Sequence, residues 1–183
     1  MTLEQRIARL EAREQIRELV ATYCFIIDSR DIDGIGRCFT RSGSFRSIDG
    51  AMNASGREAI VEQFHGRFAV LGPSNHFTHD HVIAFDDSDS AHATGLINSH
   101  AEVVRNDEAM LTSLRYHDDY RYEEGRWRFN DRSLEFFYYL QPKDYASAMK
   151  GPLRNRAYTK PHRADWPEEL ATWQNYYRER PRG

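Results

Sequence analysis

The chain has 183 residues, a formal net charge of −3 and 29% charged residues, which is the composition of one globular domain with a real core. The slight acidic excess argues against a general binder of nucleic acid or of anionic membranes. No apolar run approaches the roughly 20 residues that cross a bilayer. The first residues lack the apolar core of a signal peptide, so the predicted location is the cytoplasm. Cys24 and Cys38, the only cysteines, are expected to be buried thiols outside any disulfide framework.

The N-terminal third of the chain predicts three helices. Apolar side chains recur every three or four residues over residues 3–27, which indicates an amphipathic helix with room for a break near residues 12–14. This helix should end near residues 28–31, where Asp31 can cap a second short helix over residues 32–39. A third helix is expected over residues 56–64, with Ser55 as its cap.

The middle of the chain predicts a sheet. One short strand is expected at 44–48, before the third helix. Beyond that helix the apolar spacing changes to two, and short polar turns separate the expected strands 75–86, 91–105, 110–123 and 126–139. Helices followed by an antiparallel meander are typical of the α+β class. We expect a half-open cone in which a curved, mainly antiparallel sheet surrounds the three N-terminal helices.

The last part of the chain has a different composition. The expected cone domain spans residues 1–140, and residues 141–183 form an extended C-terminal segment rich in proline and charge. Asp165 followed by Pro167 predicts a helix start there. Because this segment also carries Trp166 and Trp173, it should pack on the sheet, over a pocket mouth or on a neighbouring subunit.

Residues 74–85 are the most informative stretch, because three histidines and an aspartate lie on an expected strand that ends in apolar residues. Alternation along a strand puts His76 on one face and His79 and His81 on the other. We expect His76 to face a cavity, and the other two histidines to face outward or to pack under the C-terminal segment.

The same stretch allows a metal site as an alternative. His79 and His81, two residues apart on one face, could chelate a metal with His117 or Glu135 as a third ligand. No further ligand pattern accompanies them, so neither a metal nor any other cofactor is predicted.

Several motifs resemble the SnoaL-like branch of the nuclear-transport-factor-2-like superfamily. They are residues 10–19 with Tyr23, then residues 28–33, and the hairpin over 116–129. The resemblance covers roughly residues 1–140. It implies the cone fold, and the family includes dehydratases and a dehydrochlorinase that work by acid–base chemistry.

The resemblance also implies site residues. The family's catalytic aspartate and histidine fall on Asp28 and His76, and a second histidine falls on His100. A tyrosine one turn before the aspartate falls on Tyr23.

Four further residues are expected to form the substrate pocket. Phe45, Leu114 and Tyr116 fall on pocket positions of one family member, and strand alternation adds Asp118 to the face of Leu114 and Tyr116. Leu114 and Tyr116 replace a serine and an asparagine of that member, which indicates a different substrate.

Together these residues predict a cofactor-independent lyase or isomerase of the dehydratase type that acts on a small, hydrophobic, cyclic, oxygenated molecule. His76 would remove a proton, Asp28 would fix its tautomer, and Tyr23 or His100 would donate a proton. Two alternatives stay open: a non-catalytic subunit similar to the β subunit of aromatic-ring dioxygenases, and a small-ligand-binding protein. The resemblance further predicts a homo-oligomer, either a dimer or a trimer, with no nucleic-acid or membrane partner.

Overall fold

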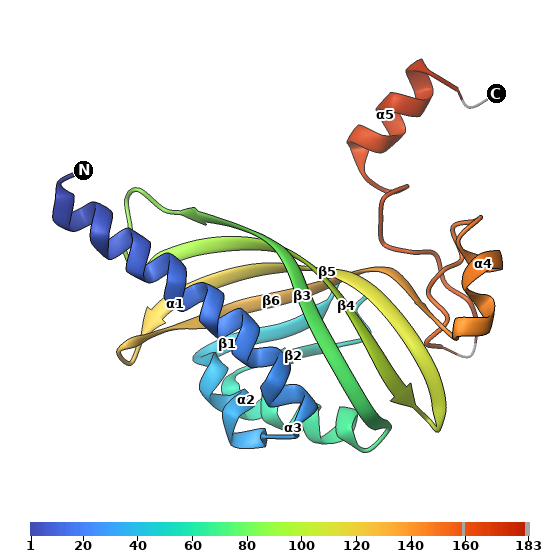
Figure 1. Cartoon of the computed structure of the whole chain (residues 1–183), viewed down its shortest axis with the longest axis horizontal. Helices are drawn as coiled ribbons and strands as arrows, with labels where there is room; N and C mark the ends of the chain where they lie inside the picture. Colours follow the sequence, from blue (N-terminus) through green and yellow to red (C-terminus); the bar gives the residue numbers. More distant parts are fainter. Residues whose placement is uncertain (159, 182–183) are drawn as a thin grey trace.

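A computed structural model describes residues 1–158 and 160–181; residues 159, 182 and 183 of the expected C-terminal segment lie outside the described residues. Three helices, α1 (Leu3–Asp28), α2 (Ile32–Cys38) and α3 (Arg57–Phe68), lie on one side of a curved six-stranded sheet (Figure 1). The sheet does not close on itself. The predicted α+β half-open cone is therefore confirmed.

The N-terminal helices begin at recognisable caps. Thr2 and Gln5 form a capping box, in which the Thr2 hydroxyl accepts the Gln5 N–H and the Gln5 side chain accepts the Thr2 N–H. Helix α1 then continues unbroken to Asp28. Asp31 caps α2 as predicted, since its carboxylate accepts the Gly34 N–H at 2.8 Å.

The predicted Ser55 cap of α3 is wrong. Ser55 ends strand β2 (Asn53–Ser55), and Gly56 is the residue before the helix, with no side-chain cap. Gly56 has a φ of 88°, in the region that favours glycine, and this conformation turns the chain from the strand into α3.

The sheet has the strand order β2-β1-β6-β5-β4-β3, and only the β1–β6 pair is parallel. Its other strands are β1 (Phe39–Ser47), β3 (Leu71–Phe85), β4 (His92–Arg105), β5 (Glu108–Glu123) and β6 (Arg126–Leu140). The four long predicted strands are confirmed, whereas β1 is longer than the expected strand at 44–48. Asn106 and Asp107 both have positive φ, as a two-residue hairpin turn requires.

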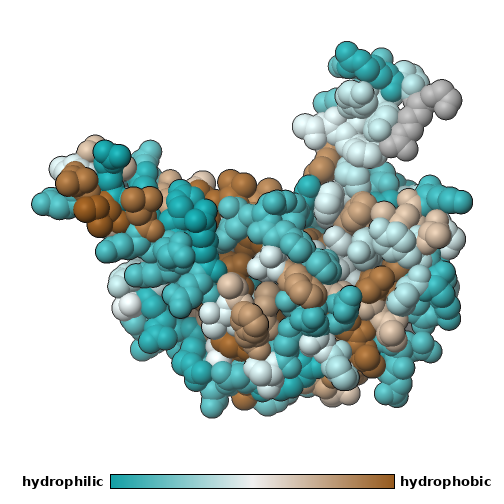
Figure 2. Space-filling view, viewed as in Figure 1, coloured by the Kyte–Doolittle hydropathy of each residue, from teal (hydrophilic) through white to brown (hydrophobic). Residues whose placement is uncertain are grey.

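The core lies between the concave face of the sheet and only part of α1. Ile16, Val20 and Ile27 of this helix are buried, but Leu3 and Leu10 are 69% and 66% exposed. Figures 1 and 2 show why: the first turns of α1 project beyond the sheet, and apolar side chains gather at that free end. The predicted apolar stripe is therefore covered only along its second half. Both cysteines are buried and free, as expected.

The C-terminal segment covers a bare edge of β6. Pairing with β1 ends at Leu134, which leaves the rest of β6 without a neighbour on that side. Backbone groups of the segment bond this edge instead, for example Asp165 N–H to Phe136 O at 2.9 Å and Tyr139 N–H to Arg154 O at 3.0 Å. The segment also contains a 3-10 turn, η1 (Pro142–Asp144), and a short helix, α4 (Tyr145–Ala148).

The predicted helix start at Asp165 is wrong. Its carboxylate accepts the Phe136 N–H of β6 at 2.6 Å, so it is not available to cap a helix. The last helix, α5 (Ala171–Glu179), begins after Leu170 and stands away from the sheet (Figure 1).

No helix among the described residues is both long and apolar enough to span a bilayer. The structure contains a single chain, so the expected homo-oligomer and cytoplasmic location stay predictions.

Candidate active site

Asp28 and His76 meet at the end of the first helix. Asp28 is the last residue of α1, and His76 lies on the facing strand β3. The His76 Nδ1 lies 2.6 Å from Asp28 Oδ1, and the His76 backbone N–H donates to Asp28 Oδ2 at 2.8 Å. The His76 side chain is 9% exposed and the Asp28 side chain is 20% exposed. Such a short contact in a mostly buried place is what an acid–base dyad needs.

Further hydrogen bonds hold the Asp28 carboxylate as an anion. The Ser74 hydroxyl donates to Asp28 Oδ1 at 2.8 Å, and Arg30 Nη1 donates to the Ser74 hydroxyl at 2.9 Å. Burial raises the pKa of Asp28, but hydrogen bonds from His76 and Ser74 outweigh it, and the pKa is lowered. An ionised Asp28 accepts the Nδ1–H of His76, which leaves the imidazole Nε2 as the basic atom.

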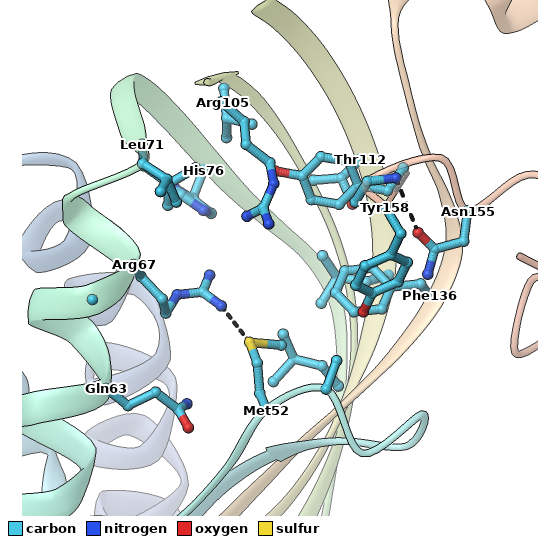
Figure 3. Close-up of a pocket in the computed structure, with 18 of the residues that line it drawn as sticks. Met52, Gln63, Arg67, Leu71, His76, Arg105, Thr112, Phe136, Asn155 and Tyr158 are labelled. Atoms are coloured by element: carbon cyan, nitrogen blue, oxygen red, sulfur yellow. Dashed lines mark hydrogen bonds between the residues drawn. The ribbon is translucent and has the colours of Figure 1, made fainter. Parts of the chain in front are cut away.

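His76 lines a cavity of about 270 Å³ between α3 and the concave face of the sheet (Figure 3). Its walls are largely apolar, with Leu71, Val103, Leu134 and Phe136 among them. A volume near the lower end of known ligand pockets suits a small molecule.

Leu114 and Tyr116, two of the residues expected in a substrate pocket, line this cavity. Burial raises the pKa of Tyr116 to about 12, although the Arg132 guanidinium, 4.0 Å above the ring, opposes the rise. Tyr116 therefore remains protonated at neutral pH.

His100 lies on the other face of the sheet, which corrects its expected role beside His76. It pairs directly with Phe77, and the two rings stack with centroids 4.7 Å apart. Its Nδ1 contacts His79 Nε2 at 2.5 Å. Since Ala101, the next residue, is the partner of His76, alternation turns His100 away from the cavity.

Comparison with known proteins now identifies the family. A family model described as a SnoaL-like domain matches residues 8–133. The chain belongs to the SnoaL-like family. A search of curated proteins found no match.

Solved structures share the cone fold with this SnoaL-like chain. A hexachlorocyclohexane dehydrochlorinase from Novosphingobium barchaimii is 14% identical with a TM-score of 0.66, covering 74% of this chain and 93% of its own. A candidate scytalone dehydratase from Novosphingobium aromaticivorans is 16% identical with a TM-score of 0.66, covering 76% and 91%. A candidate aromatic ring hydroxylase from the same organism is 22% identical with a TM-score of 0.64, covering 75% and 97%. At these identities the likeness establishes the fold alone.

In this SnoaL-like cone, Tyr23 and Phe45 belong to the core and not to the cavity wall. Tyr23 is 1% exposed and meets the Tyr116 ring edge-on at 6.4 Å. Phe45 packs against Phe39 and Phe64. Neither lines the cavity, which corrects their expected roles as proton donor and pocket residue.

Asp118 is likewise a structural residue. Its carboxylate accepts two hydrogen bonds from Arg132, at 2.9 and 2.7 Å, and one from the Tyr120 hydroxyl at 2.7 Å. Both side chains of the ion pair are fully buried, and neither lines the cavity. Asp118 lies on the expected face of β5, but Arg132 neutralises its carboxylate and the residue does not line the cavity.

A β-bulge overturns the predicted outward position of His81. Between Thr78 and His81, strand β3 gains one residue relative to β4, so His81 pairs with the buried Ile97. Its Nε2 contacts the Tyr120 hydroxyl at 3.1 Å, on the inner face. His79 stays outside, so the pair on which the metal alternative depended does not form. No cluster of three or more potential metal ligands exists among the described residues.

Burial of His81 predicts acid sensitivity of the fold. Burial lowers its pKa to about 4, below the usual value near 6.5. The unfolded chain then binds the proton more readily, so stability should fall as pH decreases from about 6.5 to about 4. We expect His81→Gln to reduce that loss by about 2 kcal/mol after allowing for partial solvent screening. Urea unfolding at the two pH values measures it; equal losses in both proteins would contradict the assignment.

Four ionisable cavity residues were not anticipated. They are Arg67 on α3, Arg105 on β4, Tyr139 on β6 and Tyr158 of the C-terminal segment. A signal existed for two of them: Arg105 shares a strand face with Val103, and Arg67 follows Phe64 by three residues on a helix. No signal pointed to Tyr158, since its position depends on how the C-terminal segment returns.

Proposed function

We propose that this SnoaL-like protein is a cofactor-independent lyase or isomerase of the dehydratase type, acting on a small cyclic oxygenated molecule. The observation that carries the proposal is the 2.6 Å contact between His76 Nδ1 and Asp28, with the same imidazole lining a largely apolar cavity. The dehydrochlorinase and dehydratase neighbours are consistent with an elimination, since their names show that this fold can host one, but the proposal rests on the site.

The chemistry is a proton transfer coupled to loss of a leaving group. His76 Nε2 removes a proton from carbon, while Asp28 fixes the imidazole tautomer and stabilises the imidazolium that forms. The electrons of the C–H bond form a new double bond, and the neighbouring C–O bond breaks. Tyr116 gives its proton to the departing oxygen, and water then carries a proton from His76 back to Tyr116. No electrons are gained or lost overall, so no redox partner is required.

The open cavity distinguishes this proposal from the supporting-subunit alternative. A purely structural subunit should fill the space between helices and sheet with side chains, whereas about 270 Å³ is open beside His76. The ligand-binding alternative predicts binding without turnover, and the test below separates it.

The proposal is tested by a cofactor-free screen of small cyclic hydroxy-carbonyl compounds, followed by mass spectrometry for loss of water or isomerisation. We expect turnover by the wild-type protein, and Tyr116→Phe should lower kcat by about 10²-fold, the lower end for acid–base catalysis. The Tyr122→Phe variant, altered at a half-exposed ring outside the cavity, is the matched control. Compounds that bind but never react would favour the ligand-binding alternative.

A further inference from the structure

Two arginines line the cavity beside His76, and the proposed chemistry uses neither. Arg67 enters from the last turn of α3, and Arg105 from the inner face of β4 at its end. Figure 3 shows both guanidinium groups and the His76 imidazole directed into the same space from three elements. A molecule bound at His76 therefore lies within reach of two positive charges.

The buried side-chain atoms of this cavity that lack a hydrogen-bond partner are all donors. Within the described residues, Nε of Arg67, Nε of Arg105 and Nε2 of Gln63 are buried without an acceptor. Arg67 Nη1 contacts the thioether sulfur of Met52, which is only a weak acceptor. The Gln63 carbonyl oxygen already accepts the Asn53 N–H at 3.2 Å. A ligand that completes this site must supply acceptors.

The walls of the cavity do not neutralise its positive charge. Among the described residues that line it, none is an aspartate or a glutamate. Burial raises the pKa of Tyr139, and the charges of Arg105 and Arg67 both oppose that rise, so the two guanidinium groups act on one hydroxyl. Two cations that face one poorly solvated space repel each other, and a bound anion removes that cost.

The guanidinium groups, the apolar wall and the volume of the cavity together indicate which kind of anion fits it. A guanidinium fork matches the two oxygens of a planar carboxylate, and Arg is preferred over Lys where such recognition matters. The remaining wall is apolar, with Leu114, Leu134 and Phe136 as its main surfaces. A cavity of about 270 Å³ admits a one-ring compound more readily than a large one.

We propose that this cavity binds a small cyclic carboxylic acid as its anion, with the carboxylate held by Arg67 and Arg105 and the ring directed toward His76 Nε2. The inference rests on the proposed function, because it names the substrate class of the same cavity. It replaces a merely hydrophobic substrate by one that is apolar at one end and anionic at the other.

The experiment titrates the full-length protein with matched pairs of uncharged and anionic ring compounds. Benzoate and cyclohexanecarboxylate are compared with benzamide and cyclohexanecarboxamide by isothermal titration calorimetry at neutral pH and low salt. We expect each carboxylate to bind about 10- to 100-fold more tightly than its amide. Arg67→Met and Arg105→Met should each remove most of that preference and leave the amide affinity unchanged. The Arg126→Met variant, altered at an exposed arginine that begins β6, is the matched control.

Two results would overturn the inference. One is equal affinity of the wild-type protein for acid and amide, and the other is an undiminished preference in both arginine variants. Circular dichroism confirms that each variant is folded. Should a methionine variant fail to fold, Arg67→Lys and Arg105→Lys replace it, because lysine keeps the charge but lacks the bidentate fork and should reduce the preference by a smaller factor.

The titration also separates this inference from the proposed function. In His76→Gln, the preference for carboxylates should persist while turnover is lost. If the wild-type protein shows no preference for carboxylates but turns over neutral compounds, the inference is overturned and the proposed function is left intact. If the wild-type protein prefers carboxylates but turns over no carboxylate and no neutral compound, the proposed function is overturned and the inference is left intact.

Discussion

Replacing Asp28 with asparagine is expected to lower kcat/KM by about 10³-fold, within the range for acid–base catalysis. The carboxylate accepts the His76 Nδ1–H at 2.6 Å and stabilises positive charge on the ring. Asparagine has the same shape but no charge, and its amide can donate to Nδ1 and so select the tautomer whose basic atom faces away from the cavity. The measurement is steady-state kinetics on a compound found in the screen.

This loss should come from chemistry and not from unfolding. The asparagine oxygen can still accept one of the hydrogen bonds from Ser74 and the His76 backbone, so Tm should change little. Asp33→Asn, on the exposed side of α2, is the matched control and should keep full activity. Full activity of Asp28→Asn itself would end the dyad hypothesis. Because hydrogen bonds lower the pKa of Asp28, its stabilising contribution in the wild type should be complete above the usual aspartate range and lost only as pH falls below it.

The largest effect on stability is expected at Asp118. Asp118→Leu should lower the free energy of unfolding by about 3–5 kcal/mol, because it leaves the fully buried Arg132 without its counter-ion. Rings of Tyr23, Tyr116 and Phe129 surround that guanidinium at 3.8–4.4 Å and cannot replace a carboxylate. Urea unfolding followed by circular dichroism measures the difference.

The double variant Asp118→Leu/Arg132→Met tests the reason for that loss. Removing both charges abolishes the uncompensated cation, so the double variant should be more stable than Asp118→Leu alone. Additive losses from the two single variants would show that packing, and not the unpaired charge, controls stability here. The cavity should also retain its carboxylate preference in a folded double variant, because Arg67 and Arg105 are untouched.

Local pattern predicted the fold well because helices and hairpins depend on short-range signals. The 3.6-residue spacing located α1, and the turn at Asn106 and Asp107 located the β4–β5 hairpin. The parallel pairing of β1 with β6 was not predicted, since nothing in either strand specifies a partner over 80 residues away. Likewise, Asp165 has the sequence of a helix cap, but a backbone N–H of β6 competes for its carboxylate.

The arrangement of the candidate site was predictable where a motif or a strand face determined it. Asp28 and His76 came from the family resemblance, and alternation placed Tyr116 on the inner face. One extra residue in β3 places His81 on the opposite face from the one that alternation predicts. The prediction for His100 was wrong for the opposite reason. Alternation holds at this position and turns His100 away from the cavity, whereas the resemblance alone had implied a role beside His76. Arg67 and Arg105 looked like ordinary charged residues, because their common cavity exists only after α3 folds against the sheet.

The C-terminal segment contributes Asn155 and Tyr158 to the cavity wall, and the Tyr158 hydroxyl bonds Asp49 at 2.6 Å. The matched family domain ends at residue 133, so this wall is built from chain that the domain does not include. Substitutions or changes of length in that segment can alter which compound fits without moving Asp28 or His76. Under the proposed function, part of the substrate selectivity is therefore encoded after residue 133, outside the stretch that encodes Asp28 and His76.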